Sequence, residues 1–290
     1  MGKLKIVTDS NSGILQKEGE ELGVYVLPMP FTINEEEYFE EISISQEKFY
    51  EFLEANADVT TSQPSQFSLE ELWSNLLKVY DEIVYIPMTS GLSGTCENAK
   101  RYAENFGGKV HVVDNKRISV TQKQSVFEAV ELAKQGKTAK EIKEFLESTK
   151  EKASIYIMVD TMKYLKKGGR VSPAAAALGA MLKLKPILSS RGENFEKYAV
   201  VMTLAQAKKK MISQIKKELE TEFKSEYEAG KMILNIAHTQ NEKEALKFKD
   251  EVLKEISNVE VRFVDPLSLS VSCHIGPGAL ALAMVIDNFA

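Results

Sequence analysis

The sequence predicts an α/β protein made of two α/β domains, the first with a parallel sheet and the second with a mixed sheet. In the first half, short apolar runs alternate with longer segments in which apolar residues recur every three or four positions. In the second half, a predicted hairpin occurs among strands and helices that also alternate. The 290 residues exceed the usual size of one domain, so two domains are expected.

The first half supplies strands and helices in turn. Strands are expected where apolar and β-branched residues run together, at 4–10, 82–88 and 110–114, and the proline-containing segment 24–33 is expected to be extended. Helices are expected at 45–55, 68–80, 119–135 and 138–150. Ser68 with Glu71, and Thr138 with Glu141, have the spacing of capping boxes at two of these helix starts. The polar segment 58–66 is expected to be a loop.

The domain boundary is expected near Glu151, which gives an N-terminal domain at 1–151 and a C-terminal domain at 152–290. Strands of the second domain are expected at 154–160, 232–238 and 259–265, with a hairpin over 185–201 that turns at Arg191-Gly192. Helices are expected at 172–182, 204–224, 242–256 and 276–286. The last helix, about 274–290, has two open placements: on its own domain or back on the N-terminal domain.

Composition and motif searches exclude several classes of function. The net charge of −5, with both signs intermixed, argues against a nucleic-acid-binding protein. No apolar run is long enough for a membrane span. The two cysteines and three histidines (Cys96, Cys273, His111, His238 and His274) do not have the spacing of a metal site, so no metal is predicted. The first residues lead directly into a strand rather than a signal peptide, so a cytoplasmic location is expected.

The segment "IPMTSGLSGTCENA", residues 86–99, has the form of a strand, a tight polar loop and a helix start. This segment would suit an anion for three reasons. It carries hydroxyl groups, its glycines allow the backbone to approach a ligand closely, and the following helix offers free N–H groups. Thr89, Ser90, Ser93 and Thr95 carry these hydroxyls. The same residues would equally suit a strand-to-helix turn that binds nothing. The loop lacks the lysine of a P-loop and matches neither a dinucleotide fingerprint nor a GxSxG elbow.

Three further stretches contain candidate binding residues. The hydroxyl cluster "TTSQPS" at 60–65 precedes a helix, where its serines would alternatively serve only as caps. His274 precedes a Gly-Pro-Gly turn and would either be structural or interact with an anion. Arg170, in "KGGRVSPAAAALGAML" at 167–182, would be either a plain surface charge or a contact for a ligand or partner. The alanines that follow it suit close helix packing, or a helix that leaves room for a slender apolar ligand.

These stretches occur in an order that resembles the DegV family of fatty-acid-binding proteins. The matching segments span nearly the whole chain: "VTDS" at 7–10, "TSQPS" at 61–65, "SGLSGT" at 90–95, "KGGRVS" at 167–172 and "HIGPGALA" at 274–281. The resemblance implies that a long-chain fatty acid such as palmitate binds in a tunnel between two α/β domains, without a further cofactor. It also implies that the protein is not an enzyme but presents the acid to a separate ATP-binding fatty acid kinase subunit, which makes acyl phosphate for phospholipid synthesis.

The resemblance also assigns roles to residues. Thr61, Ser62 and Ser93 would hold the carboxylate of the fatty acid, and Gly94 and Thr95 would shape the same loop. His274 would lie near the head group, and Arg170 would lie on the face that meets the kinase.

Two other functions remain open from the residues alone. One is a small-molecule phosphotransferase or hydrolase that uses the Ser93 loop, for which His274 is the plausible base. The other is a binding module for a small acid other than a lipid. The sequence shows neither a complete nucleophile–base pair nor a nucleotide loop, which favours the carrier interpretation.

Overall fold

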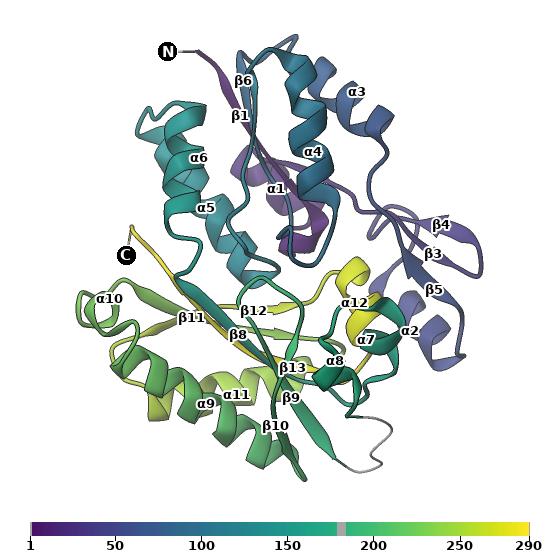
Figure 1. Cartoon of the computed structure of the whole chain (residues 1–290), viewed down its shortest axis with the longest axis vertical. Helices are drawn as coiled ribbons and strands as arrows, with labels where there is room; N and C mark the ends of the chain where they lie inside the picture. The colour runs from purple at the N-terminus through teal and green to yellow at the C-terminus, as the bar shows by residue number, and fades with distance from the viewer. Residues whose placement is uncertain (1, 179–183, 290) are drawn as a thin grey trace. The chain divides into compact units, whose positions relative to one another are not determined.

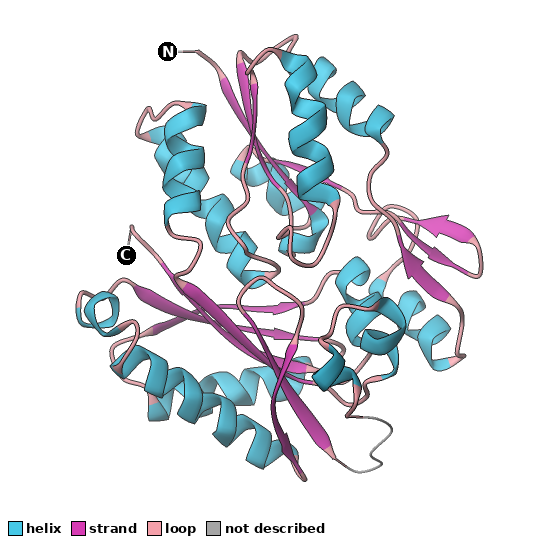
Figure 2. Cartoon of the chain, in the orientation of Figure 1, coloured by secondary structure: helices cyan, strands magenta, loops and turns pink. Residues whose placement is uncertain are grey.

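The computed structural model describes residues 2–178 and 184–289, and its chain forms two compact units (Figure 1). The first unit comprises Met1–Glu151 with Ser268–Ser270, and the second comprises Lys152–Leu267 with Val271–Ala290. Each unit has its own sheet covered by helices (Figure 2). The predicted two-domain α/β fold, with one parallel and one mixed sheet, is therefore confirmed.

The main sheet of the first unit is parallel throughout. Within the described chain it contains four strands in the order β2-β1-β6-β7. Their bounds are Leu4–Asp9 for β1, Tyr25–Leu27 for β2, Glu82–Ile86 for β6 and Val110–Val112 for β7. Strand β1 pairs with β2 on one side and with β6 on the other, so the strand order reverses direction there. The carboxyl ends of β1 and β6 therefore meet at one edge, where open α/β sheets bind ligands.

Helices cover both faces of this sheet (Figure 2). Their bounds are Gln16–Leu22 for α1, Gln66–Leu76 for α3, Thr95–Ala103 for α4, Val120–Lys134 for α5 and Ala139–Ser148 for α6. Residues of α5 and α6 share an apolar core with one face, and residues of α3 and α4 share another with the opposite face. Thr138 and Glu141 form the predicted capping box of α6. The predicted capping box at Ser68 is wrong, because α3 starts two residues earlier with Ser65 as its cap.

A second, antiparallel sheet in this unit was not expected from the sequence. Its described strands are Phe31–Ile33 (β3), Glu36–Tyr38 (β4) and Val59–Thr61 (β5), in the order β4-β3-β5. The loop predicted at 58–66 is therefore wrong at its start. Strands of three residues are too short to show an alternating pattern, and β5 lies among polar residues. Helix α2 (Gln46–Glu54) packs Phe49 edge-on against Phe31.

Two buried hydrogen bonds join Ser268–Ser270 to the rest of the first unit. The Leu269 N–H donates to Glu40 Oε2 at 2.9 Å, and Ser270 Oγ donates to Asn11 Oδ1 at 2.7 Å. Glu40 also accepts a hydrogen bond from Gln46 Nε2. Removal from water raises the pKa of Glu40 to about 7, even though both hydrogen bonds oppose the rise.

The sheet of the second unit is mixed, and its described strands follow the order β10-β9-β8-β13-β11-β12. They are Ala153–Met158 (β8), Lys185–Ser190 (β9), Glu196–Val201 (β10), Met232–His238 (β11), Glu260–Pro266 (β12) and Leu280–Ile286 (β13). Only β11 and β12 pair in parallel among these described strands. The hairpin predicted over 185–201 is confirmed as β9 and β10.

The last helix predicted at 276–286, or about 274–290, is wrong. Residues Leu280–Ile286 form β13, which lies between β8 and β11 inside the sheet. All seven of its side chains are buried. An apolar run that is buried on every side has no polar face, so periodicity does not separate a helix from a strand there. A short helix, α12 (Leu269–Ile275), precedes it instead and contains His274.

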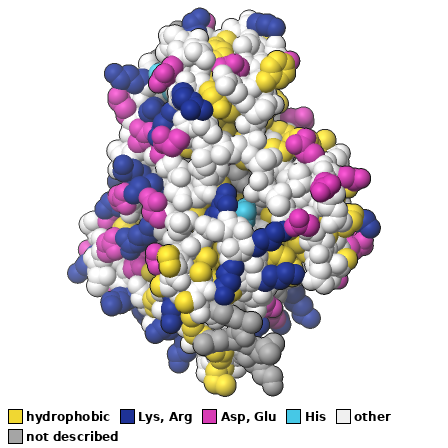
Figure 3. All heavy atoms as spheres, turned by 45° about the vertical axis from the view of Figure 1, so that its right-hand side comes forward, with side chains coloured by type: hydrophobic (Ala, Val, Ile, Leu, Met, Phe, Trp, Pro, Cys, Tyr) yellow, Lys and Arg dark blue, Asp and Glu magenta, His cyan; other side chains and the backbone are white. Residues whose placement is uncertain are grey.

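Helices α9 (Leu204–Glu220) and α11 (Glu242–Glu255) share one apolar core with the mixed sheet. Short helices complete the unit: α7 (Lys163–Gly168), α8 (Pro173–Ala176) and α10 (Lys224–Glu228). Ser172 caps α8 and Pro173 occupies its first turn. The helix predicted at 172–182 extends into 179–183, which lie outside the described residues. Basic and acidic side chains both occur across the visible face of the protein (Figure 3), in line with the mixed charges of the sequence.

Candidate functional site

The loop that follows β6 is a compact turn stabilised by its own hydroxyl groups. Thr89 Oγ1 accepts the Gly91 N–H at 3.2 Å, and Ser93 Oγ accepts the Thr95 N–H at 3.2 Å. Ser93 Oγ also lies 2.9 Å from Thr95 Oγ1. Gly94 is the N-cap residue of α4 and has no side chain to accept a first-turn N–H group. The positive end of the α4 dipole therefore lies beside the half-buried Ser93 hydroxyl.

The second hydroxyl loop follows β5. Thr61 is the last residue of that strand and is half-buried, whereas Ser62 is exposed and donates its N–H to the Pro30 carbonyl oxygen. Ser65 caps α3 by accepting the Ser68 N–H at 3.0 Å. Helix capping thus accounts for Ser65, one of the alternatives that the sequence left open, but it does not account for Thr61 and Ser62.

The structure brings these two loops together. Asn98 Nδ2, in the second turn of α4, donates to Gln63 Oε1 at 2.5 Å. A Cβ atom added to Gly94 would lie only 2.6 Å from Gln63 Nε2, so the Gln63 amide lies directly over Gly94. The loop that contains Thr61 and Ser62 therefore lies beside the loop that contains Ser93, Gly94 and Thr95, and a shared binding site for these residues stays a prediction. Sequence reasoning missed Gln63, whose only signal was its place inside the "TSQPS" segment.

Asp9 anchors the start of the Ser93 loop and was also missed as an individual residue. It is fully buried at the end of β1 and accepts three hydrogen bonds, from Met88 N at 2.9 Å, Gln122 Nε2 at 3.0 Å and Asn11 N at 3.1 Å. Burial raises the pKa of Asp9 to about 6, because desolvation outweighs these bonds. The Met88 contact joins the ends of β1 and β6, directly before the hydroxyl loop begins.

His274 and Arg170 lie in the second unit, close to Gly168. A Cβ atom on Gly168 would lie 2.0 Å from His274 Nδ1, so the imidazole occupies space that only glycine leaves free. Burial, and secondly the charge of Arg170, lower the pKa of His274 to about 4. Arg170 donates to the Gly168 carbonyl oxygen. A neutral imidazole does not balance the charge of an anion, but it retains one N–H donor. The role of His274 near a head group, and the tunnel between the domains, stay predictions.

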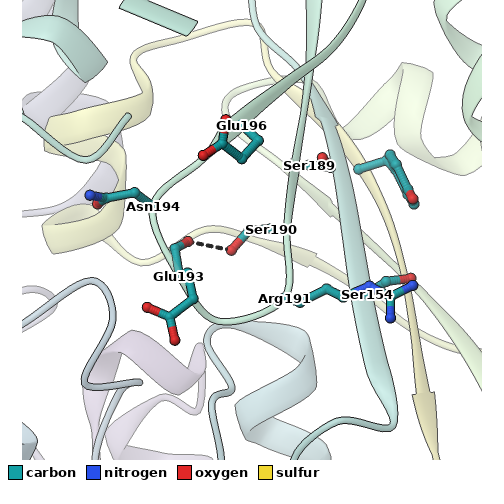
Figure 4. Close-up of a pocket in the computed structure, with 8 residues that line it drawn as sticks. Ser154, Ser189, Ser190, Arg191, Glu193, Asn194 and Glu196 are labelled. Atoms are coloured by element: carbon teal, nitrogen blue, oxygen red, sulfur yellow. Dashed lines mark hydrogen bonds between the residues drawn. The ribbon is translucent and has the colours of Figure 1, made fainter. Parts of the chain in front are cut away.

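A cavity of about 470 Å³ in the second unit adjoins the β9–β10 hairpin (Figure 4). Its lining consists of Ser154, Tyr156, Ser189, Ser190, Arg191, Glu193, Asn194 and Glu196. Ser190 Oγ donates to the Glu193 carbonyl oxygen at 2.6 Å. Arg191 forms an ion pair with Glu222 at 2.5 Å, so its charge is already balanced. Every lining residue carries a polar or charged group, which suits a polar ligand better than an acyl tail.

Among the described residues, Cys96, Glu97 and Asp114 place three ligating atoms within 4.8 Å of one another. Lys100 Nζ lies 2.7 Å from Glu97 and 3.1 Å from Asp114, so its ammonium group already pairs with both carboxylates. Burial raises the pKa of the Cys96 thiol to about 12, which disfavours the thiolate that metals bind. The group is better explained as an ion-pair cluster than as a metal centre, and the absence of a metal stays a prediction.

Comparison with known proteins identifies the family. A family model described as "Uncharacterised protein, DegV family" matches residues 3–287. The chain belongs to the DegV family. This DegV-family chain is 32% identical to Protein DegV of Bacillus subtilis over 284 residues, which cover 96% of the chain and 98% of that protein.

Solved structures of the family resemble this chain over its whole length. A DegV family protein from Thermus thermophilus, described by its fatty acid binding, superposes with a TM-score of 0.87 at 26% identity and covers 98% of this chain and 99% of its own. DegV from Bacillus subtilis, described as a fatty acid binding protein, has a TM-score of 0.83 at 29% identity, with 99% and 100% coverage. Both of these relatives are thus described by their binding of fatty acids. Within the part of the chain that the structure describes, no helix is long and apolar enough to cross a membrane.

Proposed function

We propose that this DegV-family chain binds a long-chain fatty acid such as palmitate, with the carboxylate at the two hydroxyl loops of the first unit. The observation that carries the proposal is the contact between Gln63 and Asn98, which holds the Thr61–Ser62 loop against the Ser93–Thr95 loop. The fatty-acid-binding relatives from Thermus and Bacillus match nearly the full length of the chain and support the binding of a fatty acid.

The chemistry of the loops suits a carboxylate. A carboxylate that leaves bulk water needs donors that favour its charged form, and hydroxyl groups at a helix N-terminus supply them without a metal. Thr61 and Ser93 are each half-buried, so a ligand oxygen there would be partly removed from solvent. An acyl tail adds about 0.8 kcal/mol per buried methylene, so most of the affinity would come from the tail.

We further propose that the chain is a carrier rather than an enzyme, and that it presents the acid to a separate ATP-dependent kinase subunit. Ser93 Oγ lies beside the Thr95 hydroxyl, which is not a base, so nothing in this pair would activate a nucleophile. Arg170, next to two glycines in the second unit, is our candidate for contact with the kinase. The proposal includes a cytoplasmic location and requires no cofactor or metal.

Native mass spectrometry of the freshly purified protein, followed by lipid extraction, tests the binding proposal. We expect one long-chain fatty acid per chain, together with uptake of added palmitate. A clean unliganded mass without uptake would contradict the proposal and would favour the alternative of an enzyme that uses the Ser93 loop.

Titration of palmitate into a Thr61→Ala, Ser93→Ala double variant tests the head-group assignment. We expect weaker binding, by roughly tenfold or more, because two donors to the carboxylate are lost. Thr60→Ala is a matched control, since the Thr60 hydroxyl lies 2.6 Å from that of Thr32 on the opposite face of β5. Unchanged affinity of the double variant would show that the carboxylate binds elsewhere.

A further inference from the structure

We infer that Gln63 is a positioning residue for the carboxylate site: its amide bridges to Asn98 over Gly94 and fixes the separation of the two hydroxyl loops. This inference rests on the proposed function. It assigns Gln63 no contact with the ligand; its effect is transmitted through Thr61 and Ser62 on one side and Ser93 on the other.

The hydrogen bonds around Asn98 determine how the two amides are oriented. Arg101 Nη2 donates to Asn98 Oδ1 at 3.0 Å. Because a guanidinium only donates, the Asn98 oxygen must face Arg101, and its Nδ2 then faces Gln63. Gln63 consequently presents its oxygen to Asn98 and its nitrogen to Gly94. The bridge thus has one defined arrangement, which is anchored on helix α4.

Gly94 supplies the space for this bridge. Its φ and ψ angles of −71° and −4° are open to any residue, so backbone conformation does not require glycine here. The space above its Cα atom does, because the Gln63 Nε2 atom lies 2.6 Å from the position of a Cβ atom. Alanine at this position would displace the Gln63 amide while leaving the helix start intact.

The bridge acts on a segment that is already stiff on both sides. The Ser62 N–H is bonded to Pro30, Pro64 restricts the backbone, and Ser65 caps α3. A single cross-link at Gln63 is therefore sufficient to fix the whole segment relative to α4. Without it, the ligand would have to order two independent loops, and this ordering lowers the affinity.

The test combines four variants, two single, one double and one control, with palmitate titration and thermal unfolding. We expect Gln63→Ala and Gly94→Ala each to weaken palmitate binding roughly fivefold, because the ligand would then have to order the two loops as it binds. The two changes should not add in the double variant, because both remove the same bridge. Gln63 and Gly94 are exposed, so we expect an unchanged unfolding midpoint. The matched control is Asn105→Ala, which removes the 3.0 Å bond from Asn105 Nδ2 to Glu70 that joins the α3 and α4 region farther from the loops.

Exchanging the two amide side chains tests whether binding depends on the hydrogen bond between positions 63 and 98 or on the Gln63 side chain alone. Gln63→Asn shortens one partner by a methylene and should weaken binding, whereas Gln63→Asn with Asn98→Gln restores the reach and should recover it. Three outcomes would each overturn the inference. The exchange could fail to restore binding, the effects at Gln63 and Gly94 could be additive, or all variants could bind with wild-type affinity. If the wild-type chain itself takes up no palmitate, the proposed function fails first and the inference fails with it.

Discussion

Replacing Glu40 by glutamine should stabilise the protein at neutral and alkaline pH. Glu40 is 7% exposed, and its carboxylate bonds to the Leu269 N–H at 2.9 Å. Its pKa of about 7 compares with an ordinary value of 4.5, chiefly because burial disfavours the charged form. At 1.36 kcal/mol per pKa unit, this difference corresponds to about 3 kcal/mol of unfolding free energy.

The direction of the effect follows from the raised pKa. The folded protein binds the Glu40 proton more tightly than the unfolded chain, so this contribution to stability is fully present below pH 4.5. It is lost as the pH rises from 4.5 through about 7. The neutral amide of the Glu40→Gln variant would resemble the protonated carboxyl and keep an acceptor for the Leu269 N–H, so its contribution would not change with pH.

Urea unfolding of the wild type and of Glu40→Gln at pH 4.5, 6 and 8 measures this difference. We expect the variant to gain stability relative to the wild type with rising pH, up to about 3 kcal/mol at pH 8. Glu41→Gln, at the exposed neighbouring carboxyl, is the control and should show little change. Parallel pH profiles for the wild type and Glu40→Gln would refute the reasoning, because the buried carboxyl would then have an ordinary pKa.

Three other variants test the packing of each unit. Arg117→Met should destabilise the first unit by about 3–5 kcal/mol in urea unfolding, because it removes the buried guanidinium that pairs with the buried Glu128 carboxylate; a loss below about 1 kcal/mol would contradict this. Trp73→Ala should also lower the unfolding free energy by about 3–5 kcal/mol, because the buried indole contacts Phe106 edge-on. A near-neutral effect would contradict this and would mean that neighbouring side chains fill the cavity. Gly168→Ala should displace the His274 imidazole and raise its pKa from about 4 towards 6.5, as followed by NMR titration; an unchanged value would show that the ring is not held there.

Much of the fold could be predicted because local patterns and tertiary structure agree. The Thr138 capping box, the Ser172 cap and the β9–β10 hairpin follow directly from neighbouring residues. The prediction failed at β13, where burial on both faces removes the periodic signal, and at β5, which is too short to carry one. In both places the structure depends on partner strands that are distant in sequence.

The candidate site shows the same division. The two hydroxyl loops were recognisable because small polar residues precede predicted helices. Gln63 and Asp9 were missed as individual residues, because their roles depend on side-chain contacts with Asn98 and Gln122, far along the chain. Sequence patterns identify which loops can bind, whereas the residues that hold those loops in place become visible only when distant segments are brought together.

The central place of β13 has a consequence for the order in which the second unit folds. This strand pairs with β8 on one side and β11 on the other, yet it follows both along the chain. During synthesis, β8 and β11 therefore leave the ribosome before the strand that separates them exists. Until β13 arrives, each has an unpaired edge that is prone to wrong pairing. Closure of this sheet is thus a late, long-range step, which is expected to be slow and to need protection by chaperones.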